Sequence, residues 1–182
     1  MNLCDLQTIA SVAKEQKVHN KILFWIQVGD KLPDAKVTIV EGEQHQTKSA
    51  AELFAGKKVV LFAVPGAFTP TCSAAHLPGY IAHADAFQAK GVDMIACLSV
   101  NDAFVMQAWA EGQNAEHITM LADGGAVLTQ AMGLEMSTGS FGGIRSQRYA
   151  MILDNGEVKH LALEEPKSFE VSKAERILAV LD

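Results

Sequence analysis

Residues 58–73, KVVLFAVPGAFTPTCS, carry the signals that decide the fold. Lys58 to Val64 is an apolar run, which is the pattern of a strand covered on both faces of a sheet. A loop rich in proline and glycine follows. A helix is expected to begin at Pro70, because Thr69 suits the N-cap and Pro70 suits the first helical position. The stretch therefore predicts a buried strand, a loop and a helix with Cys72 in its first turn.

The sequence on both sides of this stretch continues the alternation of strand and helix. Further strands are predicted at residues 36–40, 93–100 and 118–121, and a hairpin is predicted from strands 149–153 and 157–163. Further helices are predicted after capping boxes at Ser49–Glu52 and Ser172–Glu175, after Asn101 or Asp102, and over residues 126–132. This order indicates an α/β fold with helices flanking a central mixed sheet.

The composition limits the classes of protein to which this chain can belong. The chain has 182 residues and a mass of 19.5 kDa, the size of one domain with room for a short extension. Its net charge of −6 argues against a general nucleic-acid binder. No apolar run approaches the length of a membrane span, and residues 1–20 lack the apolar core that a secretory signal is expected to have. Three cysteines are too few for a disulfide scaffold, so we expect free thiols and a reducing, cytoplasmic location.

The N-terminal segment reads differently from the rest. Residues 1–20 are interpreted as an extension and residues 21–182 as the folded domain. Apolar residues at helical spacing, Leu3, Leu6, Ile9 and Val12, predict that the extension is helical. Cys4 lies in this segment, and the sequence identifies no partner for its thiol.

Cys72 is the strongest candidate for chemistry. In the first turn of a helix its sulfur faces unpaired backbone N–H groups and the positive end of the helix dipole. Both favour the thiolate, which is the nucleophilic form of cysteine. Loops beyond strand ends are also where α/β proteins place their sites. The alternative is a small buried cysteine that happens to lie near a helix start.

Other candidate groups give weaker signals. His76 lies four residues after Cys72, and a Cys–His pair would suit acyl transfer, but we favour local capping or packing for His76. No CxxC motif and no zinc-finger spacing occur, and the glycine-rich segment Gly139–Gly143 lacks the dinucleotide-binding order. Two of the three arginines, Arg145 and Arg148, precede the predicted hairpin, where a forked cation could hold an oxyanion or a thiolate.

Taken together, these segments resemble the peroxiredoxins. Pro65-x-x-x-Thr69-x-x-Cys72 matches the active-site signature of that family, and VPGAFTPTCSAAHLPG, residues 64–79, is similar to the peroxiredoxin-5 and plant and bacterial type II group. The strings GVDMIACLSVNDAFVMQAW and LADGGA match the same group, as does Arg145-x-x-Arg148-Tyr. The resemblance covers the chain from about residue 26 to residue 181.

The resemblance implies a thioredoxin-like fold and a peroxidase that reduces hydrogen peroxide and organic hydroperoxides with a thiol reductant and no cofactor. Cys72 is then the peroxidatic cysteine, which becomes a sulfenic acid. Thr69 positions the peroxide and the thiolate, and Pro65 shields the sulfur.

Three further residues complete the pocket that the resemblance implies. Arg148 polarises the peroxide and stabilises the thiolate, and Arg145 supports it. Phe141 falls on the apolar rim of the pocket. The family also forms homodimers, so a homodimer is expected here.

The second thiol is where this sequence departs from the animal members, because Val171 stands in place of their resolving cysteine. Cys97, 25 residues after Cys72, matches a cysteine that some type II members use for this purpose. It lies in an apolar strand, however, so we interpret it as a packed hydrophobe. The expected reductant is therefore external, glutathione with glutaredoxin. Thioredoxin, with Cys97 as resolving thiol, is the alternative, and a non-enzymatic redox-sensing module is the alternative from another class.

Overall fold

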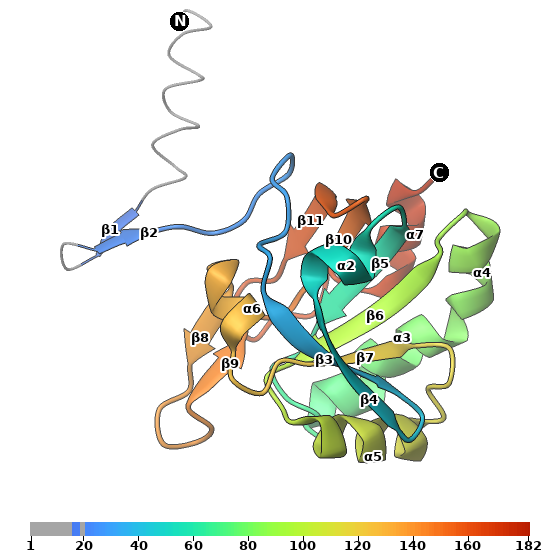
Figure 1. The fold of residues 1–182 in the computed structure, drawn as a ribbon, viewed down its shortest axis with the longest axis horizontal. Coiled ribbons are helices and arrows are strands. Elements are labelled where there is room, and N and C mark those ends of the chain that lie inside the picture. Colours follow the sequence, from blue (N-terminus) through green and yellow to red (C-terminus); the bar gives the residue numbers. More distant parts are fainter. Residues whose placement is uncertain (1–15, 19–20) are drawn as a thin grey trace, which may run out of the picture.

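The computed structural model describes residues 16–18 and 21–182, and a mixed sheet lies at its centre (Figure 1). The strands of this sheet are β3 (Lys36–Glu41), β4 (Gln44–Ser49), β5 (Lys58–Ala63), β6 (Met94–Ser99), β7 (Thr119–Ala122), β10 (Tyr149–Asp154) and β11 (Glu157–Leu163). Their order is β11-β10-β5-β6-β7-β3-β4. The pairs β5–β6 and β6–β7 are parallel, and the other neighbours are antiparallel. The predicted mixed sheet and the predicted hairpin are confirmed.

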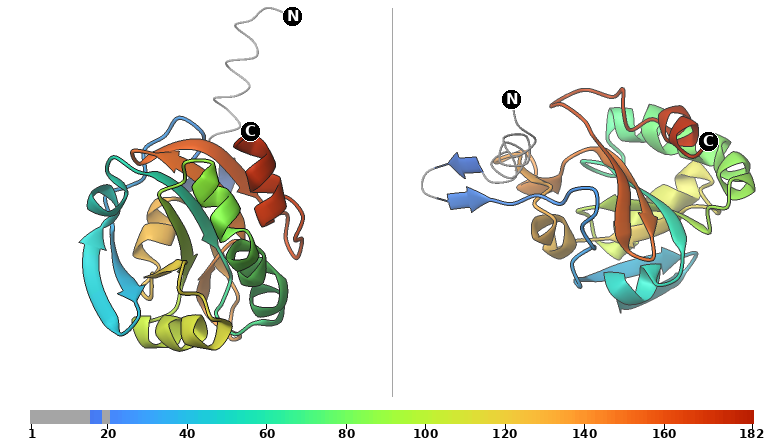
Figure 2. Two further views of the ribbon diagram at one scale, coloured as in Figure 1. Left: turned by 90° about the vertical axis from the view of Figure 1, so that its right-hand side faces the viewer. Right: turned by 90° about the horizontal axis from the view of Figure 1, so that it is seen from above.

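Helices cover both faces of the sheet and make a three-layered domain (Figure 2). They are α2 (Ala50–Phe54), α3 (Leu77–Ala82), α4 (Ala84–Ala89), α5 (Ala103–Gln113), α6 (Val127–Ala131) and α7 (Ala174–Val180), with a π-helical turn, η1 (Cys72–His76), ahead of α3. One apolar cluster joins the sheet to α3, α4, α5 and α7, and a second joins it to α2 and α6. The expected α/β class is therefore correct.

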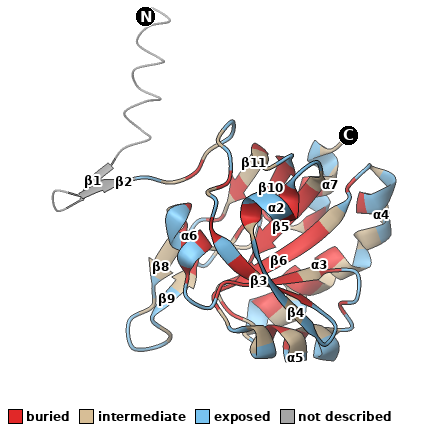
Figure 3. Cartoon of the chain, viewed as in Figure 1, coloured by how far each residue is buried: buried red, intermediate tan, exposed pale blue. Residues whose placement is uncertain are grey.

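Strand β5 shows why its sequence is a continuous apolar run. Val60 and Phe62 belong to the cluster beneath α3, whereas Val59 and Leu61 belong to the cluster on the other face. A strand buried on both faces has no polar side, so no alternation is seen in its sequence. In Figure 3 the buried colour fills β5 and β6, whereas β4, with the polar sequence QHQTKS, is largely exposed.

Two helix starts follow the sequence signals. The capping box at Ser49 is present: its hydroxyl accepts from the N–H of Glu52 at 3.2 Å, and its own N–H donates to the Glu52 carboxylate at 3.3 Å. Asp102, rather than Asn101, caps α5. The Asn101 amide oxygen instead accepts from the N–H of Ala67 at 3.0 Å, so this side chain serves the loop after β5.

The capping box predicted at Ser172–Glu175 is wrong. Helix α7 has Lys173 as its N-cap, with no side-chain cap. The N–H and the hydroxyl of Ser172 donate instead to the carboxylate of Glu164. Hydrogen bonds to a charged carboxylate are stronger than those to neutral groups, so the contact with Glu164 sets the orientation of Ser172.

Short strands flank the main sheet. The strands β1 (Gln16–Val18) and β2 (Lys21–Leu23) pair antiparallel, as do β8 (Glu135–Ser137) and β9 (Ile144–Ser146). The predicted N-terminal helix is wrong at Gln16–Val18, and at residues 1–15 and 19–20 it lies outside the described residues. The division at residue 20 stays a prediction. Within the described ranges, no helix has the length and apolarity of a membrane span.

Candidate active site

The loop after β5 is tied down on both sides. The contact from Ala67 to Asn101 fixes it to the end of β6. The Thr69 hydroxyl donates to the carbonyl of Gly66 at 2.6 Å and closes the turn. Between these contacts Phe68 has a φ of 63°, a left-handed conformation that a bulky residue rarely adopts. Such strain persists only where the surroundings impose it, and it occurs often at functional sites.

Cys72 lies in the first turn of the following helix, as predicted. The helix begins at Pro70, and the N–H of Ser73 donates to the carbonyl of Thr69 at 3.0 Å. Cys72 starts the π-helical turn, in which its carbonyl accepts from the N–H of Leu77, five residues on. Its side chain is fully buried. π-Helical turns are rare and are frequent at functional sites.

Arg148 reaches the sulfur from the neighbouring strand. It directly precedes β10, whose first residue, Tyr149, pairs with Ala63 at the end of β5. This register brings Arg148 beside the loop that leads to the helix, and its Nη2 donates to Sγ of Cys72 at 3.3 Å. A guanidinium donor at this position stabilises negative charge on the sulfur.

His76 holds the other side of this guanidinium. Nη1 of Arg148 donates to Nδ1 of His76 at 2.8 Å, and because a guanidinium cannot accept, Nδ1 carries no proton. The ring proton is therefore on Nε2, which donates to the carbonyl of Ser172 at 3.2 Å. Burial first, and then the charge of Arg148, lower the pKa of His76 to about 3, so the ring is neutral. The expected local packing of His76 is present against Tyr80, four residues on, but the expected local capping is not, because both ring nitrogens bond far along the chain.

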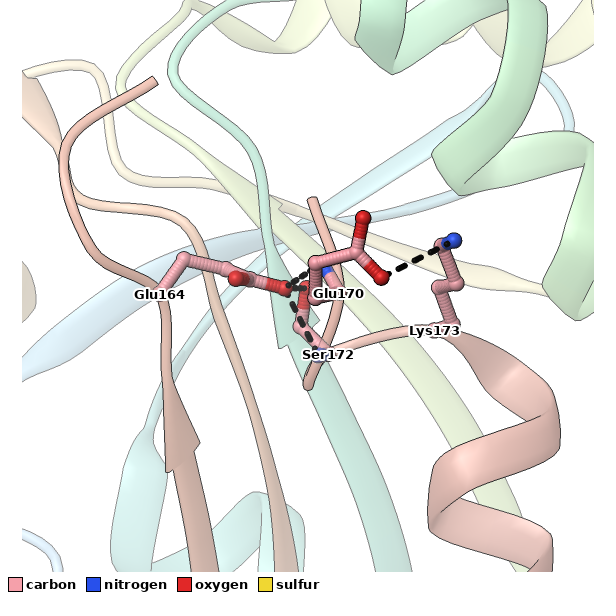
Figure 4. Close-up of polar contacts among 4 residues, drawn as sticks. All are labelled: Glu164, Glu170, Ser172 and Lys173. Carbon is pink, nitrogen blue, oxygen red and sulfur yellow. Dashed lines mark hydrogen bonds and ion pairs between the residues drawn. The ribbon is translucent and has the colours of Figure 1, made fainter. Parts of the chain in front are cut away.

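The carbonyl that receives His76 belongs to a loop closed by Glu164. This Glu164–Ser172 loop runs from the end of β11 to the start of α7. One carboxylate oxygen of Glu164 accepts from the N–H of Glu170 at 2.7 Å and from the N–H and hydroxyl of Ser172 at 2.8 and 2.9 Å (Figure 4). Burial alone would raise the pKa of Glu164, but these hydrogen bonds outweigh it and lower that pKa.

Sequence reasoning missed Glu164 and Ser172 as parts of the site. Glu164 directly follows the hairpin strand β11, where an acid normally marks only the end of the element. The one available signal was Ser172, but its place in the predicted capping box already accounted for a serine at this position. Only the closing of the loop shows that both residues face the interior.

A cleft of about 650 Å³ opens next to Arg148. Its walls are Pro65 and Thr71 from the helix start, Met136 and Gln147 from the region of β8 and β9, and residues 164–168 of the Glu164–Ser172 loop. The cleft gives a small molecule room to approach the guanidinium. Pro65 lies on its wall, and its shielding of the sulfur stays a prediction.

The chain matches the family model described as Redoxin over residues 27–178. It is 53% identical over 167 residues to Peroxiredoxin-2E-2, chloroplastic, of Oryza sativa subsp. japonica. This match covers 88% of the present chain and 74% of the rice protein. The solved structure of reduced Prx3 in complex with H₂O₂ from Vibrio vulnificus is 65% identical, with a TM-score of 0.84 and coverage of 86% and 99%. Peroxiredoxin 5 from Alvinella pompejana is 37% identical, with a TM-score of 0.75 and coverage of 86% and 97%. The chain belongs to the peroxiredoxin family.

As a peroxiredoxin of the type II and peroxiredoxin-5 group, the protein is a thiol peroxidase with a thioredoxin-like fold. The fold and the enzyme class expected from the resemblance are thereby confirmed. In the part of the chain that the structure describes, no group of three or more His, Cys, Asp or Glu side chains is arranged to hold a metal ion.

Two pocket residues expected of this peroxiredoxin lie outside the cluster around Cys72. Arg145 donates to the carbonyls of Val100 and Gly142, each at 2.9 Å, and so anchors the β8–β9 turn to the end of β6. Phe141 is 85% exposed and is absent from the walls of the cleft beside Arg148. Within one chain, therefore, the structure does not bring Phe141 to the rim.

Cys97 of this peroxiredoxin is enclosed in the sheet. It lies in β6 opposite Phe62 of β5 and is fully buried in the cluster that also contains Cys72. Burial raises the pKa of the Cys97 thiol well above its ordinary value, with Cys72 adding to the effect and Arg148 opposing it. Cys72 and Cys97 are both free thiols. Cys4 lies outside the described residues.

Proposed function

We propose that Cys72 is the peroxidatic cysteine of this peroxidase and that Arg148 stabilises its thiolate. The observation that carries the proposal is the 3.3 Å contact from Nη2 of Arg148 to Sγ of Cys72 at the start of a helix. The guanidinium and the helix terminus both favour negative charge on the sulfur. Because Cys72 is shielded from water, these electrostatic effects act at greater strength than on a surface.

The reaction follows from this arrangement. The thiolate sulfur of Cys72 forms a bond to one peroxide oxygen while the O–O bond breaks. The second oxygen takes up a proton and leaves as water or an alcohol, so the peroxide is reduced and Cys72 is oxidised to a sulfenic acid. Negative charge develops on the leaving oxygen, where Arg148 and the backbone N–H of Cys72 can stabilise it. One such donor is worth about 3 kcal/mol.

Thr69 and Pro65 are proposed to shape the peroxide site. The Thr69 hydroxyl gives its hydrogen to the carbonyl of Gly66, so its oxygen offers lone pairs to a peroxide O–H. Pro65 presents an apolar wall toward the cleft and offers no N–H that would hold water. Arg145 supports the site by fixing the neighbouring turn. Phe141 would reach a pocket rim only in a second copy of the chain.

We propose that glutathione, with glutaredoxin, resets the enzyme. The glutathione thiol condenses with the sulfenic acid of Cys72, water leaves, and the mixed disulfide is reduced by a second thiol. The alternative is attack by Cys97, with thioredoxin reducing the disulfide. Its buried position and raised pKa leave Cys97 little thiolate, so we favour glutathione.

A homodimer in the cytoplasm is proposed as the working form. Phe68, Phe104 and Phe141 are 60%, 76% and 85% exposed, and aromatic side chains of this exposure commonly mark interfaces. The rice relative is named as chloroplastic, so the compartment is tested separately by localising the protein in its own cell. Sedimentation that gives the 19.5 kDa mass of a single chain at micromolar concentration would contradict the dimer.

The geometry argues against acyl transfer by Cys72 and His76. Arg148 occupies Nδ1 of His76 and the Ser172 carbonyl occupies Nε2. Neither ring nitrogen can accept the Cys72 proton, which a general base in such a pair must do.

The test is the intact mass of the fully reduced protein after one equivalent of hydrogen peroxide, measured beside Cys97→Ala. A gain of one oxygen atom on Cys72 in both proteins supports a one-cysteine mechanism that awaits glutathione. A loss of two hydrogens that is absent in Cys97→Ala would instead support Cys97 as the resolving thiol. Oxidation without turnover by either reductant would favour a redox sensor. An unchanged mass while peroxide persists would contradict the role of Cys72.

A further inference from the structure

We propose that Glu164 is a positioning residue for Arg148. Its carboxylate closes the Glu164–Ser172 loop, and the closed loop sets the direction of His76 and hence of the guanidinium that contacts Cys72. The inference rests on the proposed roles of Cys72 and Arg148. It adds that Glu164 fixes the far end of the chain of hydrogen bonds that runs from Arg148 through His76 to the loop.

The link from the loop to His76 passes through one carbonyl. The carbonyl of Ser172 accepts from Nε2 of His76 at 3.2 Å and from the hydroxyl of Tyr80 at 2.8 Å. Two donors occupy both of its lone pairs, so the position of this carbonyl decides where the histidine ring rests. The backbone of Ser172 is in turn held by Glu164, which accepts from its N–H and its hydroxyl.

A second route joins the same loop to the guanidinium. The N–H of Glu164 donates to the carbonyl of Arg148 at 3.0 Å, so the two backbones are paired where the hairpin ends. Phe169, within the loop, has its ring centroid 5.6 Å from Cζ of Arg148 and 5.0 Å from the His76 ring. Closing the loop therefore also sets an aromatic ring against both partners, where it can attract the cation.

The carboxylate is specifically suited to this task. Glu164 is only 7% exposed, and one of its oxygens receives three donors. Removing the side chain would leave two backbone N–H groups and a hydroxyl without their acceptor, and the loop would have to rearrange to satisfy them. A glutamine keeps one carbonyl oxygen but adds an NH₂ group that requires an acceptor, so its effect should be intermediate.

The loop offers a matched control in Glu170. Its backbone N–H donates to Glu164, but its carboxylate points away and pairs with Lys173 at 3.5 Å (Figure 4). The side chain of Glu170 is 71% exposed. Glu170→Gln therefore makes the same chemical change in the same loop and leaves the Glu164 contacts in place.

The experiment measures the second-order rate of Cys72 oxidation by hydrogen peroxide in Glu164→Ala, Glu164→Gln, Ser172→Ala and Glu170→Gln. We expect Glu164→Ala to slow the reaction about ten- to a hundredfold, because a small displacement of a catalytic group has effects of this size. Glu164→Gln and Ser172→Ala should have smaller effects, and Glu170→Gln should have none. Ser172→Ala and Glu164→Gln keep the test decisive if Glu164→Ala does not fold.

The same series in an Arg148→Ala background separates positioning from general damage. If Glu164 acts through Arg148, its removal should slow the reaction no further once Arg148 is absent. An equal further loss in that background would overturn the inference, as would a wild-type rate in folded Glu164→Ala. If Arg148→Ala alone left the rate unchanged, the proposed function would fail instead, so the two failures are distinguishable.

Discussion

Cys72 and Cys97 are both fully buried in the same apolar cluster, yet the structure gives them different surroundings. Cys97 lies mid-strand in β6, where burial raises the pKa of its thiol. Cys72 lies at a helix start beside a cleft, with the guanidinium of Arg148 at 3.3 Å. Exposure therefore does not separate the proposed reactive thiol from the packed one. The charged group beside the sulfur of Cys72 does.

The largest effect should come from removing each thiol in turn. Cys72→Ser should abolish turnover of hydrogen peroxide with glutathione and glutaredoxin, because no other described thiol has a comparable setting. Cys97→Ala should keep most of the turnover, because Cys97 packs within the sheet and the proposal gives it no chemical role. Peroxide consumption measures both. A loss of activity in Cys97→Ala equal to that of Cys72→Ser would break the distinction between the two cysteines.

Removing the guanidinium of Arg148 should lower the reactivity of Cys72 toward that of Cys97. Arg148→Ala is expected to lower the second-order rate with peroxide about 10²- to 10³-fold, the cost of losing one preorganised donor. Arg148→Lys should recover only part of this, because a single ammonium lacks the fork that contacts Sγ of Cys72 and Nδ1 of His76 together. Stopped-flow fluorescence can follow the rate. An unaffected rate in a folded Arg148→Ala would contradict the proposed role of Arg148 and with it the proposed function.

The neutral ring of His76 should make the free energy of unfolding depend on pH. Its folded pKa of about 3 lies below the ordinary 6.5, so below pH 6.5 the unfolded chain binds a proton that the folded one does not. Stability from this group is full above pH 6.5 and falls as the pH decreases toward 3, by about 2 kcal/mol at pH 5. Urea unfolding at pH 7 and pH 5 measures it, with His76→Gln as the control. Equal pH dependence in both proteins would count against the neutral ring.

The smallest effect concerns Cys97 as a packing residue. Cys97→Ala should lower the free energy of unfolding by about 1 kcal/mol, the usual loss for a small buried group. Chemical denaturation at pH 7 tests this. A stability unchanged from that of the wild type would indicate that the Cys97 position is loosely packed, and the case against its movement toward Cys72 would weaken.

Much of the fold could be predicted because its signals are local. The apolar run of β5, the proline after Thr69 and the caps at Ser49 and Asp102 each act within a few residues, and each is found in the structure. Predictions failed where a residue distant in the sequence forms hydrogen bonds with the predicted element. Ser172 has a capping sequence, but its N–H and hydroxyl donate to Glu164 and α7 begins without a side-chain cap, and no local pattern contains that information.

The sequence by itself determined the α/β class, the family signature and the place of Cys72 in the first turn of a helix, because helix starts and buried strands depend on neighbouring residues. The resemblance already named Arg148 as the partner of the thiolate, but the tertiary structure alone decided that His76 and the Glu164–Ser172 loop hold its guanidinium. Arg148 is 76 residues from Cys72, and His76 is 96 residues from Ser172. Strand register and loop closure bring them together, since hydrogen bonds form between groups that packing makes adjacent, whatever their separation along the chain.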